Sequence, residues 1–378
     1  MAKRGQNEGS IYKRKDGRWA GVLNLGYQNG KLKRKTFYGM TRVEVAEKLN
    51  NALSDQKKGL PVIVERQNVG QFLERWLEDC VKPKVRPNTY YSYEGHVRLY
   101  LKLGLGHIQL IKLSPQQVQN FMKSQLDAGR SPRLVKYLRT VLRVALNQAL
   151  KWNLVARNVA TLVDPPRYIQ PEVVPFSSDQ VKGFLIAIKG DRLETLFLLM
   201  LSMGLRKGEA LGLRWEDVDY DANLIRIQNS LQRIDKKLQL VELKTTRSRR
   251  ALSIPETINS ALRTHRVRQL EDKLLAGERW KESRLVFATS LGTPLNPRNV
   301  LRSFHRVLGK AGIPKQGVHN LRHSCASLLL QQNVHARTIM DVLGHSRIGV
   351  TMDTYSHVMP QTMHAAANVM DTILVGSN

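Results

Sequence analysis

The spacing of apolar and polar positions changes twice along the chain and divides it into three pieces. In the first piece, three strand-like segments at residues 10–14, 19–25 and 32–38 are separated by short turns. Thr41, followed three residues later by Glu44, is typical of a helix N-terminus, and the helix is expected to reach about residue 56. The pattern therefore predicts a three-stranded antiparallel sheet followed by one helix.

A helical period of apolar residues begins at Val69 and marks the second piece. Its last predicted helix carries an apolar stripe from Leu134 to Ala149, which is expected to face a core. Basic residues lie off this stripe, where they either follow DNA phosphates or form an ordinary solvated face. These candidate DNA contacts are Lys136, Arg139 and Arg143. The helices are expected near residues 87–100, 114–128 and 132–152.

The third piece begins near Phe176 and mixes helices with a few short strands. Residues 193–203 are apolar on nearly all sides, which predicts a central buried helix. A short helix is expected after Gly204, then a strand at residues 224–228 and a β ribbon at about 238–254. The remainder has helical spacing.

Proline-rich or aperiodic stretches separate the pieces, at residues 59–68 and 165–175. A chain of 378 residues also exceeds the size at which single cores stop growing, about 250–300 residues. The predicted fold class is a multidomain, mainly α protein with small β elements. The expected domains are residues 1–60 (sheet plus helix), 66–165 (helical) and 175–378 (mixed α/β, mostly α).

The charge of the chain points to a polyanionic partner. Lys and Arg number 60 against 31 Asp and Glu, a formal net charge of +29, and nucleic acid is the leading candidate. A membrane-surface protein is disfavoured, because no long apolar run and no signal-like start occur, so a cytosolic location is expected. Cys80 and Cys325 are too few for a disulfide framework or a thiolate zinc site.

Basic residues of the first piece are also candidate DNA contacts. Arg18, Lys33 and Lys35 are interleaved with aromatic residues on the expected sheet, which would place them toward a DNA groove. The aromatic residues themselves are more simply interpreted as the core of this small domain. They are Trp19, Tyr27, Phe37 and Tyr38.

Four short segments of the third piece carry the candidate chemistry. They are GLRKGE from Gly204, ELKTTRSRR from Glu242, HNLRH from His319, and LGHS from Leu343 with TYSH around Tyr355. Taken singly, the first indicates a structural ion pair and the second a solvated basic hairpin. In the third, His and Arg three residues apart share one helical face, where both can hold one anion.

Together and in this order, these segments resemble the tyrosine recombinase (phage integrase) family. The resemblance covers nearly the whole chain and implies a catalytic third piece, a helical (SAM-like) core-binding second piece, and a first piece that binds separate arm-type sites. It also implies the site residues. The catalytic set would be Arg206, Lys244, His319, Arg322, His345 and the nucleophile Tyr355, with Glu209 in support.

Other residues near this set are not assigned to it. Lys236, Lys237 and Arg247 lie in the same region as Lys244, but Lys244-Thr245 best matches the position of the family's lysine. His323 completes the common HxxRH form and is interpreted as structural.

The residue types suit the cleavage of DNA by a phenol oxygen. Two guanidinium groups can hold the non-bridging oxygens of a phosphate that gains negative charge. A tyrosine, with an ordinary pKa near 10, needs a base, for which His319 is the candidate, and the departing 5′ oxygen needs an acid, for which Lys244 is the candidate. The 3′-phosphotyrosine stores the bond energy for rejoining, so neither ATP nor a metal or other cofactor is expected.

The resemblance implies partners as well. These are double-stranded DNA with core and arm sites, a homotetramer at synapsis, an excision factor and a DNA-bending host protein, in the cytoplasm of a bacterial host. The residues after Tyr355 form a loosely amphipathic tail, expected to pack on a neighbouring subunit or on its own domain. The rival interpretations are a DNA-binding protein without catalysis, a type IB topoisomerase and a chromosome-dimer resolvase.

Overall fold

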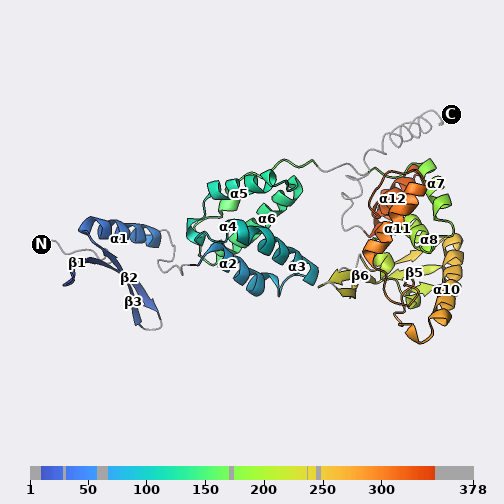
Figure 1. Cartoon of the computed structure of the whole chain (residues 1–378), viewed down its shortest axis with the longest axis horizontal. Coiled ribbons are helices and arrows are strands. Elements are labelled where there is room, and N and C mark those ends of the chain that lie inside the picture. Colours follow the sequence, from blue (N-terminus) through green and yellow to red (C-terminus); the bar gives the residue numbers. More distant parts are fainter. Residues whose placement is uncertain are drawn as a thin grey trace, which may run out of the picture. The chain divides into compact units, whose positions relative to one another are not determined.

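The computed structural model of the chain consists of two compact units, Met1–Gln170 and Pro171–Asn378 (Figure 1). It describes residues 10–28, 31–57, 67–169, 174–235, 237–243 and 248–344. Within the described ranges, no helix is both long and apolar enough to cross a bilayer.

The first unit begins with the antiparallel sheet that the sequence predicts. Its strands are β1 (Ser10–Lys13), β2 (Trp19–Gln28) and β3 (Lys31–Gly39), in the order β1-β2-β3, and α1 (Arg42–Lys57) follows. The expected cap is confirmed, because Thr41 Oγ1 accepts a hydrogen bond from the backbone N–H of Glu44 at 3.2 Å.

The aromatic residues of the sheet do not all lie in the core. Phe37 packs on the core formed with α1, but its neighbour Tyr38 is 46% exposed and Tyr12 is 49% exposed. Successive residues of a strand point to opposite faces, so Phe37 and Tyr38 cannot both face the helix. The expectation that the aromatics build the core is therefore wrong for Tyr38.

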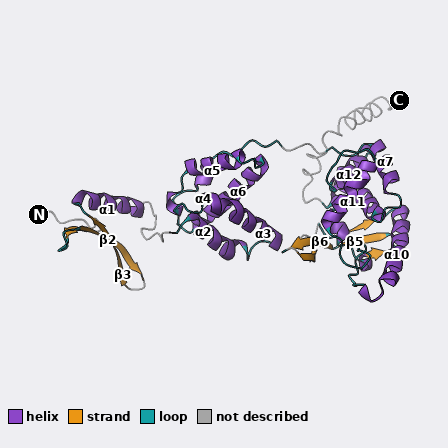
Figure 2. Cartoon of the chain, in the orientation of Figure 1, coloured by secondary structure: helices purple, strands orange, loops and turns teal. Residues whose placement is uncertain are grey.

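A bundle of helices follows within the same unit (Figure 2). Asn68 and Ser114 form capping boxes with Gln71 and Gln117, so Asn68 begins a helix rather than ending the preceding linker. The apolar stripe of α6 is buried, as expected. The helices are α2 (Val69–Trp76), η1 (Leu77–Val81), α3 (Pro87–His96), η2 (Val97–Leu101), α4 (Lys102–Leu105), η3 (Leu110–Lys112), α5 (Pro115–Asp127), α6 (Pro132–Lys151) and η4 (Val159–Leu162).

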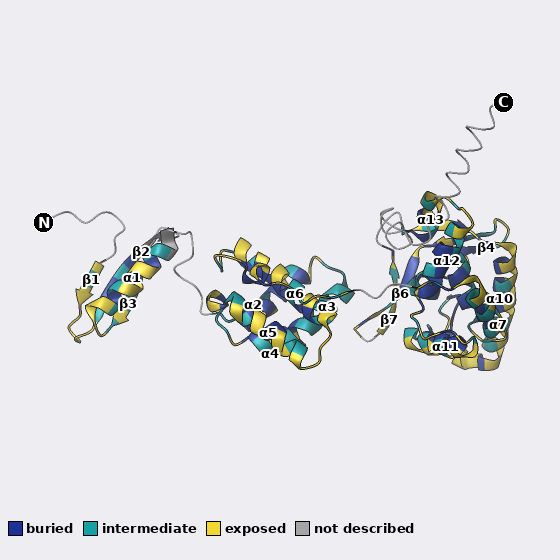
Figure 3. Cartoon of the chain, turned by 90° about the horizontal axis from the view of Figure 1, so that it is seen from above, coloured by how far each residue is buried: buried dark blue, intermediate teal, exposed yellow. Residues whose placement is uncertain are grey.

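The second unit is mainly helical, and its described residues form a large hydrophobic core and a smaller cluster of Ala326, Ile339 and Leu343. The expected central helix is confirmed, because α8 is buried on nearly all sides. Figure 3 shows buried positions gathered on α12, whereas α10 carries many exposed ones. The helices are α7 (Ser178–Ile188), α8 (Glu194–Met203), α9 (Lys207–Leu211), η5 (Trp215–Asp217), α10 (Glu256–Ala276), η6 (Gly277–Arg279), α11 (Pro297–Lys310), α12 (Asn320–Gln331) and α13 (Ala336–Leu343).

The strands of this unit differ from the ribbon expected at residues 238–254. β6 (Asn229–Ile234) and β7 (Lys237–Glu242) form an antiparallel hairpin. β8 (Arg250–Ser253) instead pairs with β5 (Leu224–Ile227), which also pairs with β4 (Val218–Asp219). β7 and β8 thus belong to two different sheets. The buried Leu252 of β8 completes the core beside β5, whereas β7 is largely exposed.

Candidate active site

Arg206 is held at the start of α9 by Glu209. The backbone N–H of Arg206 donates to Glu209 Oε2 at 3.1 Å, and Arg206 Nη1 donates to Oε1 at 2.7 Å. Its Nη2 donates to the carbonyl of Gly344 at 3.2 Å, at the end of α13. The side chain is 39% exposed, so the guanidinium is anchored on one side and reaches solvent on the other.

Arg322, in the first turn of α12, is hydrogen-bonded to the backbone just before Arg206. It is 1% exposed, and its Nη1 donates to the carbonyl of Gly204 at 2.8 Å. Gly204 ends α8 with φ +59°, and a Cβ there would lie 2.4 Å from Leu343 Cδ2. A glycine is required by both the backbone angle and the close approach, so one turn fixes the positions of both arginines.

His319 lies at the N-terminus of α12, one turn from His323. The two rings meet edge to face, with centroids 4.9 Å apart. Loss of hydration, followed by the positive charges of His323, Arg322 and Arg206, lowers the pKa of His319 to about 4. The ring is therefore neutral at pH 7 and able to accept a proton.

Glu209 is the buried counter-ion of this cluster and is 2% exposed. Burial raises the pKa of Glu209. The charges of Arg250 and Arg206, with their hydrogen bonds, together lower this pKa by more, so the net shift is downward and the carboxylate stays ionised. Arg250 Nη2 lies 3.1 Å from Glu209 Oε2. Arg250 ends the segment ELKTTRSRR, but no role in the site was predicted for it; the signal in the sequence is that its spacing from Leu252 and Ile254 places it on the buried side of a strand.

The structure thus brings together four of the residues expected from the sequence. They are Arg206, Glu209, His319 and Arg322. The other three, Lys244, His345 and Tyr355, lie outside the described residues, as does the tail that follows Tyr355. In the ranges that the structure does describe, no three His, Cys, Asp or Glu side chains are grouped as metal ligands would be.

Comparison with known proteins decides the family. Residues 176–362 match the phage integrase family, and residues 68–126 match the N-terminal SAM-like domain of phage integrases. A tyrosine recombinase XerC-like protein of Caldanaerobacter subterraneus is 32% identical over 367 residues, covering 92% of this chain and 94% of the relative. The chain belongs to the tyrosine recombinase family. It is a site-specific DNA recombinase, an enzyme that transfers DNA strands.

Solved structures share the fold of this recombinase. The integrase of the transposon Tn1549, in complex with a circular intermediate DNA, matches with a TM-score of 0.68 and 19% identity, covering 80% of this chain and 99% of that one. A lambda integrase tetramer bound to a Holliday junction matches with a TM-score of 0.57 and 15% identity, covering 93% of this chain and 96% of that one. These likenesses support the multidomain, mainly α fold.

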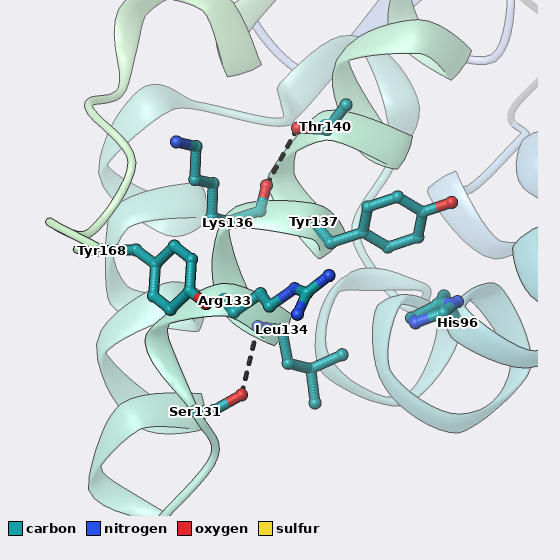
Figure 4. A pocket seen from close by; sticks show the side chains of 8 residues that line it. All are labelled: His96, Ser131, Arg133, Leu134, Lys136, Tyr137, Thr140 and Tyr168. Atoms are coloured by element: carbon teal, nitrogen blue, oxygen red, sulfur yellow. Dashed lines mark hydrogen bonds between the residues drawn. The ribbon is translucent and has the colours of Figure 1, made fainter. Parts of the chain in front are cut away.

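In the helical bundle of the recombinase, a pocket of about 540 Å³ opens beside the first half of α6 (Figure 4). Lys136 lines it, as expected for an exposed basic residue, and Arg133, which the sequence analysis missed, lines it too. Arg143 is also exposed. Arg139 differs, because it is half-buried and its Nε donates to the carbonyl of Val163 at 2.7 Å, which ties α6 to the segment after η4. The other lining residues are His96, Ser131, Leu134, Tyr137, Thr140 and Tyr168.

The basic residues expected on the N-terminal sheet do not share one surface where the structure describes them. Arg18 pairs with Asp16 at 2.9 Å in the turn before β2. Lys35 lies over the ring of Phe37, with Nζ 5.5 Å from the centroid, and therefore faces α1; the side chain of Lys33 lies outside the described part. The face away from α1 presents a different basic and aromatic set. It comprises Tyr12, Arg14, Arg34 and Tyr38.

Proposed function

We propose that this recombinase cleaves DNA with Tyr355 and holds the scissile phosphate between Arg206 and Arg322. The phenol oxygen forms a bond to phosphorus while the bond from phosphorus to the 5′ oxygen breaks, which leaves a 3′-phosphotyrosine and a free 5′-hydroxyl. His319 accepts the phenol proton, Lys244 donates a proton to the 5′ oxygen, and His345 donates a hydrogen bond to the phosphate. Attack by that hydroxyl reverses these steps and joins the new strands.

The observation that carries the proposal is the convergence of two arginines on one neutral histidine. Arg322 lies below the surface and is already removed from water, so its charge acts with little screening. Arg206 is anchored by Glu209 and presents its open side to solvent. Both charges act on the ring of His319, so a phosphate bound beside that ring would lie near two positive charges.

The remaining pieces are proposed to select the DNA. We assign residues 175–378 to catalysis, residues 66–165 to core-site binding and residues 1–60 to arm-type sites. On α6, the residues Arg133, Lys136 and Arg143 recur at spacings of three and seven and share one face, which would follow phosphates. On the N-terminal sheet, the exposed face with Arg14 and Arg34 replaces Lys35 as the proposed contact surface, and Lys33 stays a proposed contact.

The proposed biological role is integration and excision of a phage or other mobile element in the cytoplasm of a bacterial host. A homotetramer on paired attachment sites is the proposed active assembly, by analogy with the lambda integrase tetramer bound to a Holliday junction. An excision factor and a DNA-bending host protein are proposed to set the direction of the reaction.

The test is covalent capture of DNA. Nicked duplexes tiled across the DNA that flanks the gene for this chain would be incubated with the protein and separated on a denaturing gel. We expect a protein-DNA adduct with the native chain and none with Tyr355→Phe, because only the nucleophilic oxygen is removed.

Two results contradict the proposal. An adduct that persists in Tyr355→Phe rejects Tyr355 as the nucleophile. A native protein that binds a duplex tightly and site-specifically, but forms no adduct with it, favours a DNA-binding protein without catalysis.

A further inference from the structure

Arg250 is a buried arginine that has no place in the proposed set of DNA-contacting residues. It begins β8, and its side chain is 7% exposed. Its guanidinium connects segments that are far apart in sequence. Nη2 lies 3.1 Å from Glu209 Oε2, Nε donates to the carbonyl of Val342 at 2.8 Å, and Nη1 donates to the carbonyl of Ser248 at 3.2 Å.

Glu209 is shared between this arginine and Arg206. One of its oxygens accepts from Arg206 Nη1 and the other from both Arg250 and the backbone N–H of Arg206. The end of α13 is held in the same way, since Arg250 binds the carbonyl of Val342 and Arg206 binds that of Gly344. One carboxylate and two arginines therefore tie together the starts of α9 and β8 and the end of α13.

We propose that Arg250 is a positioning residue for strand cleavage: it fixes Glu209 and the end of α13, and through them sets the direction of the Arg206 guanidinium. It does not touch the phosphate. In sequence, Arg250 binds the carbonyl of Ser248, which follows the segment that contains Lys244, and the carbonyl of Val342, which lies shortly before His345. The inference rests on the proposed function, because it takes Arg206 as a phosphate-binding residue.

Only an arginine suits this position. The planar guanidinium group of arginine presents N–H groups in several fixed directions. Arg250 uses three of its nitrogens to donate hydrogen bonds to three segments. A lysine keeps the charge but offers one nitrogen, which cannot span the same three acceptors. Arg250→Lys is therefore the sharpest variant, because it preserves the charge next to Glu209 and removes the geometry.

The experiment compares two substrates. The scissile phosphate would first be mapped with the native protein, whose adduct formation separately tests the proposed function. Cleavage would then be timed on a nicked duplex with the ordinary phosphate and on one with a methylphosphonate at that position. The phosphonate lacks one negative oxygen, so its transition state carries less charge and depends less on a well-aligned arginine.

We expect Arg250→Lys to bind the ordinary duplex with unchanged Kd and to cleave it on the order of 10²-fold more slowly. The defect should shrink at least about tenfold on the methylphosphonate, as it should for Arg206→Ala, because both variants impair stabilisation of the phosphate charge. The matched control is Arg226→Lys on the adjacent strand, where an exposed arginine pairs with Asp219 at 3.0 Å, and its rate should equal that of the native chain.

An equal fold-change on both substrates overturns the proposal, because a general loss of folded enzyme affects them alike. A second variant separates an effect on folding from an effect on the position of Arg206. Arg250→Met combined with Glu209→Leu replaces the buried ion pair by apolar side chains, which proteins often tolerate. If this double variant folds and cleaves the ordinary duplex at the native rate, Arg250 does not position Arg206.

Discussion

His319 illustrates how single side chains determine protonation in this site. Two arginines, Arg206 and Arg250, bind the carboxylate of Glu209, and Arg322 adds a third positive charge that acts on His319, so the described part of the site has an excess of positive charge. The loss of hydration, together with this excess of positive charge, lowers the pKa of the imidazole and keeps it neutral. A neutral ring is the form that a general base requires, and the same charge attracts a DNA phosphate.

The lowered pKa of His319 makes the stability of the DNA-free protein depend on pH. Between the folded value of about 4 and the ordinary value of 6.5, the unfolded chain binds more protons than the folded one. The contribution of His319 to stability is therefore complete above pH 6.5 and is lost as the pH falls toward 4. We expect His319→Gln to flatten the decline of Tm measured between about pH 7.5 and pH 4.5.

A comparison at pH 8 provides the internal control. There, both folded and unfolded chains carry a neutral His319, so any difference in Tm between the variant and the native chain reflects packing alone. If the two pH profiles run parallel down to pH 4.5, the inferred shift in the pKa of His319 is incorrect.

At the scale of elements, the turn between α8 and α9 organises the site. Gly204 adopts a left-handed conformation, its carbonyl binds Arg322, and Arg206 follows two residues later. The end of α13 packs against the same turn, since Leu343 lies where a side chain at Gly204 would be. α8 and α13, which are far apart in the sequence of this unit, therefore meet at Gly204.

We expect Gly204→Ala to lower the free energy of unfolding by about 2–4 kcal/mol, from the left-handed backbone and from overpacking against Leu343. Calorimetry of the full chain would measure this loss. Gly190→Ala is the matched control, because Gly190 has φ +75° but nothing lies within 4 Å of its added Cβ. Its cost should be only the backbone term, roughly 1–2 kcal/mol, and equal costs at the two positions would contradict close packing at Gly204.

The basic face of α6 is proposed to contact DNA phosphates. Each phosphate contact contributes about 0.9 to the slope of log K against log salt concentration, so Lys136→Gln should reduce that slope by about one. Binding of a core-site duplex would be followed by fluorescence anisotropy at several salt concentrations. Lys151→Gln, at the other end of α6, is expected to leave the slope unchanged. A slope unaffected by Lys136→Gln would remove this residue from the interface.

At the scale of the whole molecule, the net charge of +29 far exceeds what a catalytic site requires. It is spread over the chain, and it suits a protein that holds a long stretch of DNA backbone. In the proposed mechanism, fixed arginine charges take the place of the metal ions of two-metal nucleases, because they neutralise the charge that develops on phosphate.

Adduct formation is therefore expected to continue in excess EDTA at the rate seen without it. The measurement is a time course on a nicked duplex with the native chain, with and without chelator. A restriction endonuclease that requires magnesium, assayed in the same tubes, would confirm that free metal has been removed. A loss of adduct in EDTA that returns when magnesium is added would contradict metal-free catalysis.

The sequence alone determined the elements whose signals are local. Period-two and helical spacings, together with the capping residue Thr41, predicted most strands and helices. The order and spacing of four short segments predicted which residues carry the chemistry, through their resemblance to a known family. Arg206 and Arg322 were found in this way, 116 positions apart in the chain.

Tertiary structure decided what depends on contacts between distant segments. Pairing of β8 with β5 rather than β7 follows from burial of Leu252, and no local signal specifies a strand's partner. The role of Arg250 depends on carbonyls and a carboxylate from three segments, and the lowered pKa of His319 depends on charges brought close only by folding. Hydrogen bonds and Coulomb interactions act over a few ångströms in space, whatever the separation along the chain.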